Sequence, residues 1–300
     1  MELTSPKPPL LQPSWLRVII FVLVYLGINL LAYRLLGSGL AITDAICDYL
    51  AKVSGNSNRD FNFILLTLFV SFFLSVALVV VFRKWIDRQT VSSLGFAYRT
   101  HIPDAIIGFL LPVIILGIVS LILYFNKNLG WADISFSSGD FLNGLLLMII
   151  IAVGEEMVFR GYILNNLIQS LNKWLALAIS AALFALMHSN NPSVDIVAMM
   201  NLFVGGLLLG INYVFTKNLW FSILLHTAWN FLQGPILGFP VSGVNLQSIL
   251  HPELKGNVLL TGGGFGLEAS LLTGMMLLIT VLILYLIYQS RAEEGVHPSV

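Results

Sequence analysis

Charged side chains are scarce in this chain of 300 residues, since Asp, Glu, Lys and Arg make up only 10% of it. Soluble domains carry about 25% charged residues, so this composition excludes an ordinary soluble globular protein. Hydrophobic residues make up 57% of the chain and the mean hydropathy is +0.89, as expected of an integral membrane protein. Basic and acidic residues number 15 each, and this balance gives no indication of a nucleic-acid partner.

Cysteine is nearly absent, because Cys47 is the only one in the sequence. A single cysteine cannot form an internal disulfide, so the chain has no disulfide scaffold. The sequence also lacks a cleavage site of the A-x-A type after its first apolar run, which follows a polar and proline-rich start. We therefore interpret this run as a retained transmembrane helix and not as a signal peptide.

Long apolar runs recur along the whole sequence. A helix needs about 20 residues to cross the roughly 30 Å hydrocarbon core of a bilayer. Runs of about that length lie at 16–36, 61–82, 105–126, 141–164, 174–188, 196–216, 218–238 and 269–290. The sequence therefore predicts an all-α, polytopic integral membrane protein with about eight transmembrane helices. We expect a polar N-terminal tail at 1–15, a transmembrane helical domain at 16–290 and a C-terminal tail at 291–300.

The distribution of Lys and Arg near the ends of these runs predicts the orientation, because cytoplasmic loops are richer in both. With the N-terminus inside, the inner segments hold Lys7, Arg17, Arg83, Lys84, Arg88, Arg99, Lys173, Lys217 and Arg291. The outer segments hold only Arg34, Lys52, Arg59, Lys127 and Lys255. Both termini are thus predicted to be cytoplasmic, and the basic stretch at 82–99 is predicted to meet anionic lipid headgroups of the bilayer.

The fourth apolar run contains three charged residues in the sequence GEEMVFRG, at 154–161. A charge at the bilayer centre costs roughly 2.5–3.5 kcal/mol, so such residues are expected to face the protein interior and to find partners. Glu156 and Arg160 are four residues apart and can pair on one helix face. Glu155 is rotated away by about 100°. A purely structural ion pair would explain one carboxylate and leave the second one unexplained.

Two later runs contain histidines. His188 ends the fifth run, where a lone histidine is usually an interfacial residue. His226 and Asn230 lie four residues apart in the seventh run, where such a pair can form hydrogen bonds between helices. Glu155 and His188 are expected at similar depth. His226 lies only nine residues beyond Lys217 and is expected about 10 Å shallower, unless the fourth helix continues past the membrane.

Together these residues form a hydrolytic set without a serine or cysteine nucleophile. A buried carboxylate near a histidine can activate water, and an amide with a second histidine can donate to a developing oxyanion. The sequence contains no HExxH of a zincin, no GxSG before a histidine and no GxGD of an aspartyl protease. These absences favour amide hydrolysis by glutamate and histidine over the other intramembrane protease designs.

The motifs resemble those of the CPBP family, the intramembrane peptidases that include CAAX-prenyl-protease-like and bacteriocin-processing (Abi-type) proteins. EExxxR reads Glu155–Glu156–Met157–Val158–Phe159–Arg160, FxxxH reads Phe184–Ala185–Leu186–Met187–His188, and HxxxN reads His226–Thr227–Ala228–Trp229–Asn230. Each motif alone is weak, but three in order on three predicted spans are specific. The resemblance covers about 95–245, which we take as the motif core.

The resemblance implies an eight-helix bundle with an intramembrane cavity open to the cytosolic leaflet of a bacterial plasma membrane. It implies that Glu155 and His188 activate water and that His226 with Asn230 forms the oxyanion site. Glu156 and Arg160 would orient and balance the first group, and Phe184 would pack the cavity wall.

Two questions about this chemistry stay open at the level of the sequence. The family is often classed as metalloendopeptidases, and Zn²⁺ could be held by Glu155, His188 and His226, but the spacing does not decide between a metal-dependent and a metal-free mechanism. The substrate is expected to be a membrane-associated protein or peptide, prenylated or not.

Two other classes of function compete with an endopeptidase. A proton-coupled transporter could use buried Glu and His as a relay, although the sequence has no internal symmetry of the kind many transporters show. A non-catalytic membrane scaffold could have kept the site. The glycine-rich stretches GPILGFPVSG and TGGGFG are interpreted as turns between helices, with a lid or substrate gate as the alternative.

Overall fold

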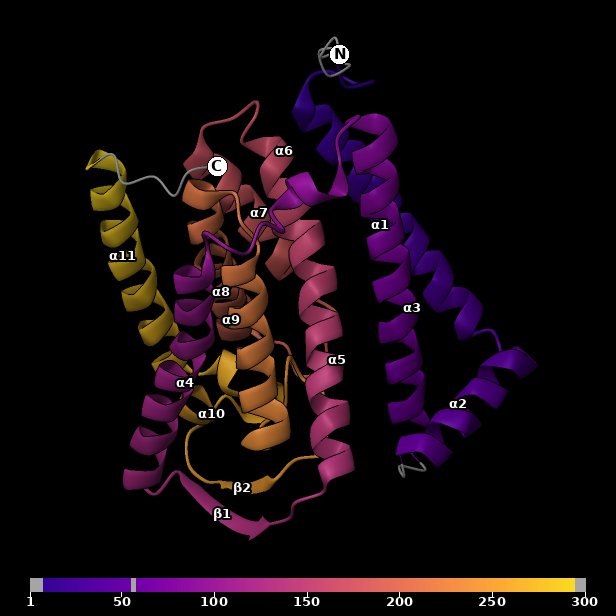
Figure 1. The fold of residues 1–300 in the computed structure, drawn as a ribbon. Helices are drawn as coiled ribbons and strands as arrows, with labels where there is room; N and C mark the ends of the chain where they lie inside the picture. The colour runs from indigo at the N-terminus through magenta and orange to yellow at the C-terminus, as the bar shows by residue number, and fades with distance from the viewer. Residues whose placement is uncertain (1–7, 55–57, 295–300) are drawn as a thin grey trace. The chain divides into compact units, whose positions relative to one another are not determined.

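The computed structural model describes residues 8–54 and 58–294 of the chain (Figure 1). The chain divides into two compact units, the first ending at Ser93 and the second beginning at Leu94, and each is described by itself. Residues 1–7 of the predicted N-terminal tail and residues 295–300 of the predicted C-terminal tail lie outside the described residues.

The first unit consists of helices. They are α1 (Ser14–Leu36), α2 (Ala41–Ser54), α3 (Arg59–Val81), the π-helix η1 (Phe82–Ile86) and the 3₁₀ turn η2 (Val91–Leu94), which runs into the second unit. Helix α3 begins where Asn58 accepts hydrogen bonds from the backbone N–H groups of Asp60 and Phe61, as an N-cap residue does. The amphipathic helix α2 was not predicted, because 14 residues are too few for a membrane span.

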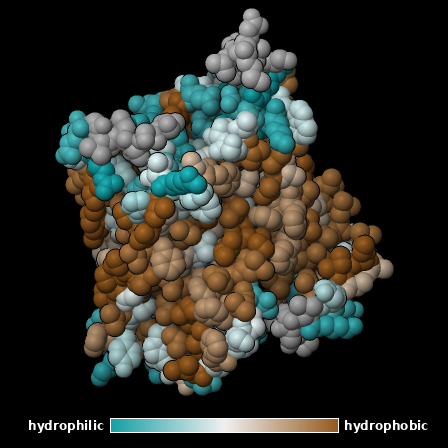
Figure 2. Space-filling view, viewed as in Figure 1, coloured by the Kyte–Doolittle hydropathy of each residue, from teal (hydrophilic) through white to brown (hydrophobic). Residues whose placement is uncertain are grey.

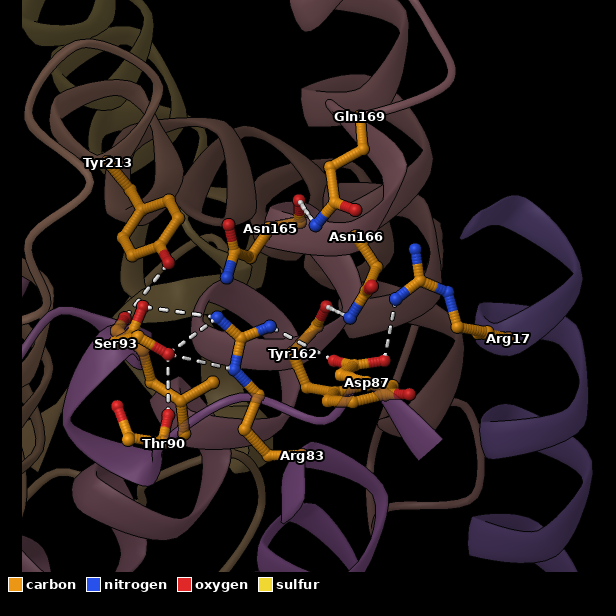
Figure 3. A network of polar contacts seen from close by, with 11 residues as sticks. Arg17, Arg83, Asp87, Thr90, Ser93, Tyr162, Asn165, Asn166, Gln169 and Tyr213 are labelled. Carbon is orange, nitrogen blue, oxygen red and sulfur yellow. Dashed lines mark hydrogen bonds and ion pairs between the residues drawn. The ribbon is translucent and has the colours of Figure 1, made fainter. Parts of the chain in front are cut away.

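The buried carboxylate of Asp87 connects the start of α1 to η1, the π-helix that follows α3. Asp87 accepts from Arg17 Nη1 at 2.8 Å and from Arg83 Nη1 at 3.0 Å, one bond to each carboxylate oxygen (Figure 3). Arg83 Nη2 also donates to Ser93 Oγ at 2.8 Å. Charges removed from water need such partners, and these bonds fix the start of α1 against the segment that follows η1.

The second unit contains most of the helices and the short strands. Its elements are α4 (Ile102–Phe125), β1 (Leu129–Ile134), α5 (Ser138–Glu156), η3 (Met157–Leu164), α6 (Asn165–Leu167), α7 (Lys173–Met187), α8 (Ile196–Thr216), α9 (Trp220–Phe231), η4 (Leu232–Ile236), β2 (Leu250–Leu254), α10 (Val258–Thr261), η5 (Gly263–Phe265), η6 (Leu267–Ala269) and α11 (Leu271–Glu293). Strands β1 and β2 pair antiparallel, with Leu129 opposite Leu254 and Ile134 opposite Leu250. This small sheet was not predicted.

Helix α9 lies inside the second unit, packed against α4, α5 and α8 (Figure 1). Small residues allow the close approach of these helices, as is usual in membrane proteins. A Cβ atom at Gly206 of α8 would lie 2.9 Å from Ala181 Cα of α7, and one at Gly108 of α4 would overlap the backbone of Phe221 in α9. The two glycines therefore set the spacing of α7 to α8 and of α4 to α9.

A polar contact inside the second unit joins three helices. Asn212 Nδ2 of α8 donates to the Tyr288 hydroxyl of α11 at 2.7 Å, and that hydroxyl donates to Asp104 Oδ1 of α4 at 2.8 Å. All three side chains are buried. Because an apolar bilayer offers no alternative partners to these groups, the contact stabilises this arrangement of α4, α8 and α11.

The fold class predicted from the sequence is confirmed, since the protein is an all-α, polytopic membrane protein. Among the described residues, six helices are long and apolar enough to cross a membrane, and α7 is apolar but shorter. Figure 2 shows apolar side chains over the middle of α4, α5 and α11, with hydrophilic ones toward the helix ends. All eight predicted runs are helical, but a count of eight membrane-crossing helices stays a prediction.

Candidate active site

The EExxxR motif lies where α5 changes into a π-helix. Glu155 and Glu156 are the last residues of α5, and η3 continues from Met157 to Leu164 with backbone hydrogen bonds of the wider i to i+5 type. Single turns of this kind recur at functional sites. Eight consecutive residues of η3 are buried, so the motif lies inside the second unit.

The predicted ion pair between Glu156 and Arg160 is present. Arg160 Nη1 donates to Glu156 Oε1 at 2.8 Å, and both side chains are fully buried. Arg160 Nη2 donates to the carbonyl oxygen of Gly206 in α8 at 3.0 Å. The guanidinium thus connects η3 to α8 and balances one of the two carboxylates.

His226 of α9 contacts both glutamates. Its Nδ1 lies 2.8 Å from Glu156 Oε1, and since a carboxylate only accepts, Nδ1–H is the donor. Its Nε2 faces Glu155 Oε2 at 3.9 Å. The expected depth difference of about 10 Å between His226 and this pair was wrong. The fourth helix continues through η3 and α6 to Leu167, so Glu155 and Glu156 lie at the same level as His226.

His188 follows the last residue of α7, and Phe184 lies one turn before it. The Nδ1–H of His188 donates to the carbonyl oxygen of Phe184 at 2.8 Å, so its Nε2 is the nitrogen that can take a proton. The ring of Phe184 lies 4.8 Å from the His188 ring and 6.0 Å from the His226 ring, measured between centroids. The Arg160 guanidinium lies 4.7 Å from the same ring. Phe184 therefore packs between the two imidazoles.

The position of α7 follows from a contact at its middle. Ser180 Oγ donates to the carbonyl oxygen of Phe159 at 2.9 Å, and the rings of Phe159 and Phe184 pack edge to face at 5.3 Å. These contacts hold α7 against η3, and they bring the FxxxH motif to the EExxxR motif.

Some predicted partners are not joined directly. Within residues 8–54 and 58–294, no hydrogen bond or ion pair links Glu155 to His188, and none links Asn230 to either histidine. Asn230 is buried one turn beyond His226 on α9. Glu155 Oε2 and Glu156 Oε2 are buried oxygens that no donor of the described residues reaches. They keep acceptor capacity for a water molecule or a substrate.

Sequence reasoning missed a third carboxylate near these residues. Glu268 of η6 is 9% exposed, and the charges of His188 and His226 partly offset the rise that burial causes in the pKa of its carboxyl. Its Oε2 accepts from the backbone N–H of Ser242 at 2.7 Å and from the Ser242 hydroxyl at 3.0 Å. The signal was the acidic residue that stands two positions after the glycine-rich stretch TGGGFG, a stretch that the sequence alone indicates as a turn.

The side chains do not fit a metal site. No three His, Cys, Asp or Glu side chains of the described residues gather so that they could hold a metal ion. Glu156 Oε1 is already the acceptor for both Arg160 and His226, and His188 Nδ1 is bonded to a carbonyl oxygen. The classification as a metalloprotease and the zinc ligands considered from the sequence are therefore not supported, and no step through a metal is derived.

The fold and these residues define an integral membrane protein with a buried cluster of glutamates and histidines. Residues 137–232 match the family model described as Rce1-like, type II CAAX prenyl endopeptidase Rce1-like. The matched stretch contains all three motifs, and it confirms the resemblance to the CPBP family. Searches of curated proteins and of solved structures found no match. The family match indicates a peptidase and supports intramembrane endopeptidase activity of the CAAX type in general.

Proposed function

We propose that this protein is an intramembrane endopeptidase that cuts a membrane-associated protein or peptide near its end, by glutamate- and histidine-assisted attack of water. The observation that carries the proposal is the contact of His226 with both glutamates of the EExxxR motif, at 2.8 Å and 3.9 Å. These residues come from segments 70 positions apart, and all belong to the stretch that matches the peptidase family.

Glu155 and His188 activate the attacking water. No donor of residues 8–54 and 58–294 reaches Glu155 Oε2, and His188 Nε2 can accept because Nδ1–H donates to the carbonyl oxygen of Phe184. The water transfers a proton to this pair while its oxygen attacks the carbonyl carbon of the scissile amide. General base catalysis of this kind contributes roughly 10²–10⁴-fold to the rate.

His226 and Asn230 receive the developing oxyanion. His226 donates to Glu156 through Nδ1, so an imidazolium form also presents Nε2–H, 3.9 Å from Glu155 Oε2. In that form the charges of Glu155, Glu156, Arg160 and His226 sum to zero, which a buried cluster favours. The base and the oxyanion donor then lie on two sides of one carbonyl group. The proton finally passes to the amine nitrogen as the C–N bond breaks.

Cleavage by purified protein in liposomes tests the proposal, with peptides that carry a lipid-modified cysteine near the C-terminus and unmodified versions of the same peptides. Glu155→Gln and His188→Ala are each expected to lower kcat by about 10²–10⁴-fold, as for loss of a general base. Asn230→Ala is expected to cost about 10²-fold, as for loss of an oxyanion donor.

The matched controls are Glu253→Gln and His251→Ala on strand β2, which change the same residue types away from the cluster. They are expected to retain activity. Full activity of Glu155→Gln or of His188→Ala in a folded protein would refute the mechanism. Uptake of a solute driven by a pH gradient, without cleavage, would favour a transporter.

A further inference from the structure

Glu268 lies in a segment whose backbone is hydrogen-bonded to α8. The segment passes from α10 through η5 and η6 to Ser270, which caps α11. Asn201 of α8 donates from Nδ2 to the carbonyl oxygens of Glu268 and Ser270, at 2.8 Å each. Gly266 has φ +103°, which a side chain would strain, and a Cβ there would overlap the carbonyl oxygen of Pro240. These contacts fix where the Glu268 side chain begins.

Ser242 fixes the position of the Glu268 carboxylate. Both Ser242 donors bond the same oxygen, Oε2, at 2.7 Å and 3.0 Å. Ser242 has φ +48°, in the left-handed region that favours glycine, so its backbone N–H donates from a strained conformation. Backbone strain of this kind is concentrated at functional sites.

Ser242 is hydrogen-bonded to the turn that contains His188. Asn191 Nδ2 donates to the carbonyl oxygen of Ser242 at 3.1 Å, and the backbone N–H of Asn191 donates to the carbonyl oxygen of His188 at 3.0 Å. The segments holding His188, Ser242 and Glu268 thus form one hydrogen-bonded assembly. Ser242 and Glu268 lie beyond residue 232, outside the stretch that matches the peptidase family.

The charges around Glu268 favour its interaction with the imidazoles. Burial is the largest effect on the Glu268 carboxyl and raises its pKa above the ordinary value, and the Ser242 hydrogen bonds and the positive charges of His188 and His226 offset this rise only in part. The charge interaction is mutual, so the Glu268 carboxylate stabilises a protonated imidazole as much as that imidazole stabilises the carboxylate. His188, unlike His226, has no carboxylate in direct contact among the described residues.

We propose that Glu268 is a positioning residue of the active site, whose carboxylate, held by Ser242, stabilises the imidazolium that His188 becomes when it takes a proton from water. In that step a water O–H bond breaks, the proton binds His188 Nε2 and the oxygen attacks the carbonyl carbon. Glu268 contacts neither the water nor the substrate. The proposal rests on the proposed function, because His188 acts as a base there.

Two variants, one that removes the charge of Glu268 and one that keeps it on a shorter side chain, test this charge in the liposome assay. Glu268→Gln keeps an acceptor for Ser242 but removes the charge, and we expect kcat to fall about 10–100-fold with KM within about twofold. Glu268→Asp keeps the charge and is expected to recover part of this loss. Glu253→Gln, on the exposed carboxylate beside Lys255, is the control. Wild-type kcat in Glu268→Gln, or a larger loss in Glu268→Asp than in Glu268→Gln, would overturn the proposal.

A second measurement does not depend on cleavage. Infrared titration of the protein labelled at glutamate carboxyls follows the Glu268 signal, identified as the one missing in Glu268→Gln. Because the His188 charge lowers the pKa of the Glu268 carboxyl, His188→Ala is expected to move this titration to higher pH, whereas His251→Ala leaves it in place.

If the Glu268 titration in His188→Ala is unchanged, the coupling of Glu268 to His188 is overturned, even when the wild-type protein cleaves peptides. A shifted titration in a protein that cleaves no peptide would refute the proposed function and leave the coupling standing. Loss of activity in Glu155→Gln together with unchanged activity in Glu268→Gln would refute the inference and keep the proposed function. The two failures are therefore distinguishable.

Discussion

At the scale of single residues, the two adjacent glutamates have different environments. Glu156 is fully buried, and its Oε1 accepts from both Arg160 and His226. The Glu155 side chain is 28% exposed, and in the part of the chain that the structure describes its Oε2 has no hydrogen-bond donor, with His226 Nε2 at 3.9 Å. We infer that Glu156 organises the cluster and that Glu155 is left to act on water, which gives a reason for both carboxylates in one helix.

This difference predicts separable effects on stability and activity. Glu156→Ala leaves Arg160 and His226 without their shared acceptor, and breaking a buried ion pair costs roughly 3–5 kcal/mol. We expect Glu156→Ala to lower the midpoint temperature of unfolding in detergent. Glu155→Gln is expected to keep the wild-type midpoint while losing activity. Equal destabilisation by both variants would contradict the division of roles.

Lys217 predicts a pH dependence of stability. Burial and the charge of Lys173 lower the pKa of Lys217 from 10.5 to about 8. Between these values the unfolded chain binds more protons than the folded one, so the stability of the wild type rises with pH from about 8 to 10.5. Below pH 8 the charged form is a full cost to the folded state.

Lys217→Met is therefore expected to raise the unfolding midpoint at pH 7 and to remove the rise between pH 8 and 10.5. Lys255→Met, on an exposed side chain in the same unit, is the control and should change neither. A variant with the wild-type pH profile would show that Lys217 does not titrate in this way.

At the scale of helices, the candidate active site depends on how closely α7 and α8 approach. A Cβ at Gly206 would lie 2.9 Å from Ala181 Cα, whereas one at the neighbouring Gly205 would meet nothing within 4 Å. The carbonyl oxygen of Gly206 also accepts from Arg160. The position of α8 is thus tied to the position of the EExxxR motif.

Gly206→Ala is expected to destabilise the protein by roughly 1–3 kcal/mol, as overpacking does, and to reduce cleavage as α8 shifts from Arg160. Gly205→Ala, one residue away on the same helix, should leave both unchanged. Thermal unfolding and the liposome assay check the pair. Similar losses in the two variants would indicate a general effect of alanine in α8 and contradict the packing argument.

Local features of this structure could be predicted from the sequence, and features that depend on distant contacts could not. The eight apolar runs are helical because length and hydropathy are properties of a single segment. The Glu156–Arg160 pair follows from their spacing. The contact of His226 with Glu156 depends on the offset of α9 against α5. The burial of Glu268 depends on Ser242 and Asn201, 26 and 67 residues away.

At the scale of the whole molecule, the orientation in the membrane stays a prediction from the Lys and Arg distribution. Lys255 follows strand β2 and Glu294 follows α11, and the 23 residues of α11 rise about 35 Å. The two positions belong to the same unit, so labelling them compares two ends of one body.

Single cysteines introduced in a Cys47→Ala background test this orientation. Lys255→Cys is expected to react with a membrane-impermeant maleimide on intact cells. Glu294→Cys should react only after permeabilisation, because both termini are predicted to be cytoplasmic. The reverse pattern would place the termini outside the cell.

We propose that the buried glutamate and histidine cluster cuts proteins at the membrane. The most direct measurement compares protein termini in cells that produce the wild-type protein with those in cells that produce Glu155→Gln at equal abundance. We predict that a set of new C-termini, on membrane-associated proteins, is present with the wild type and absent with the variant. Identical sets of termini in the two cell populations would contradict the claim.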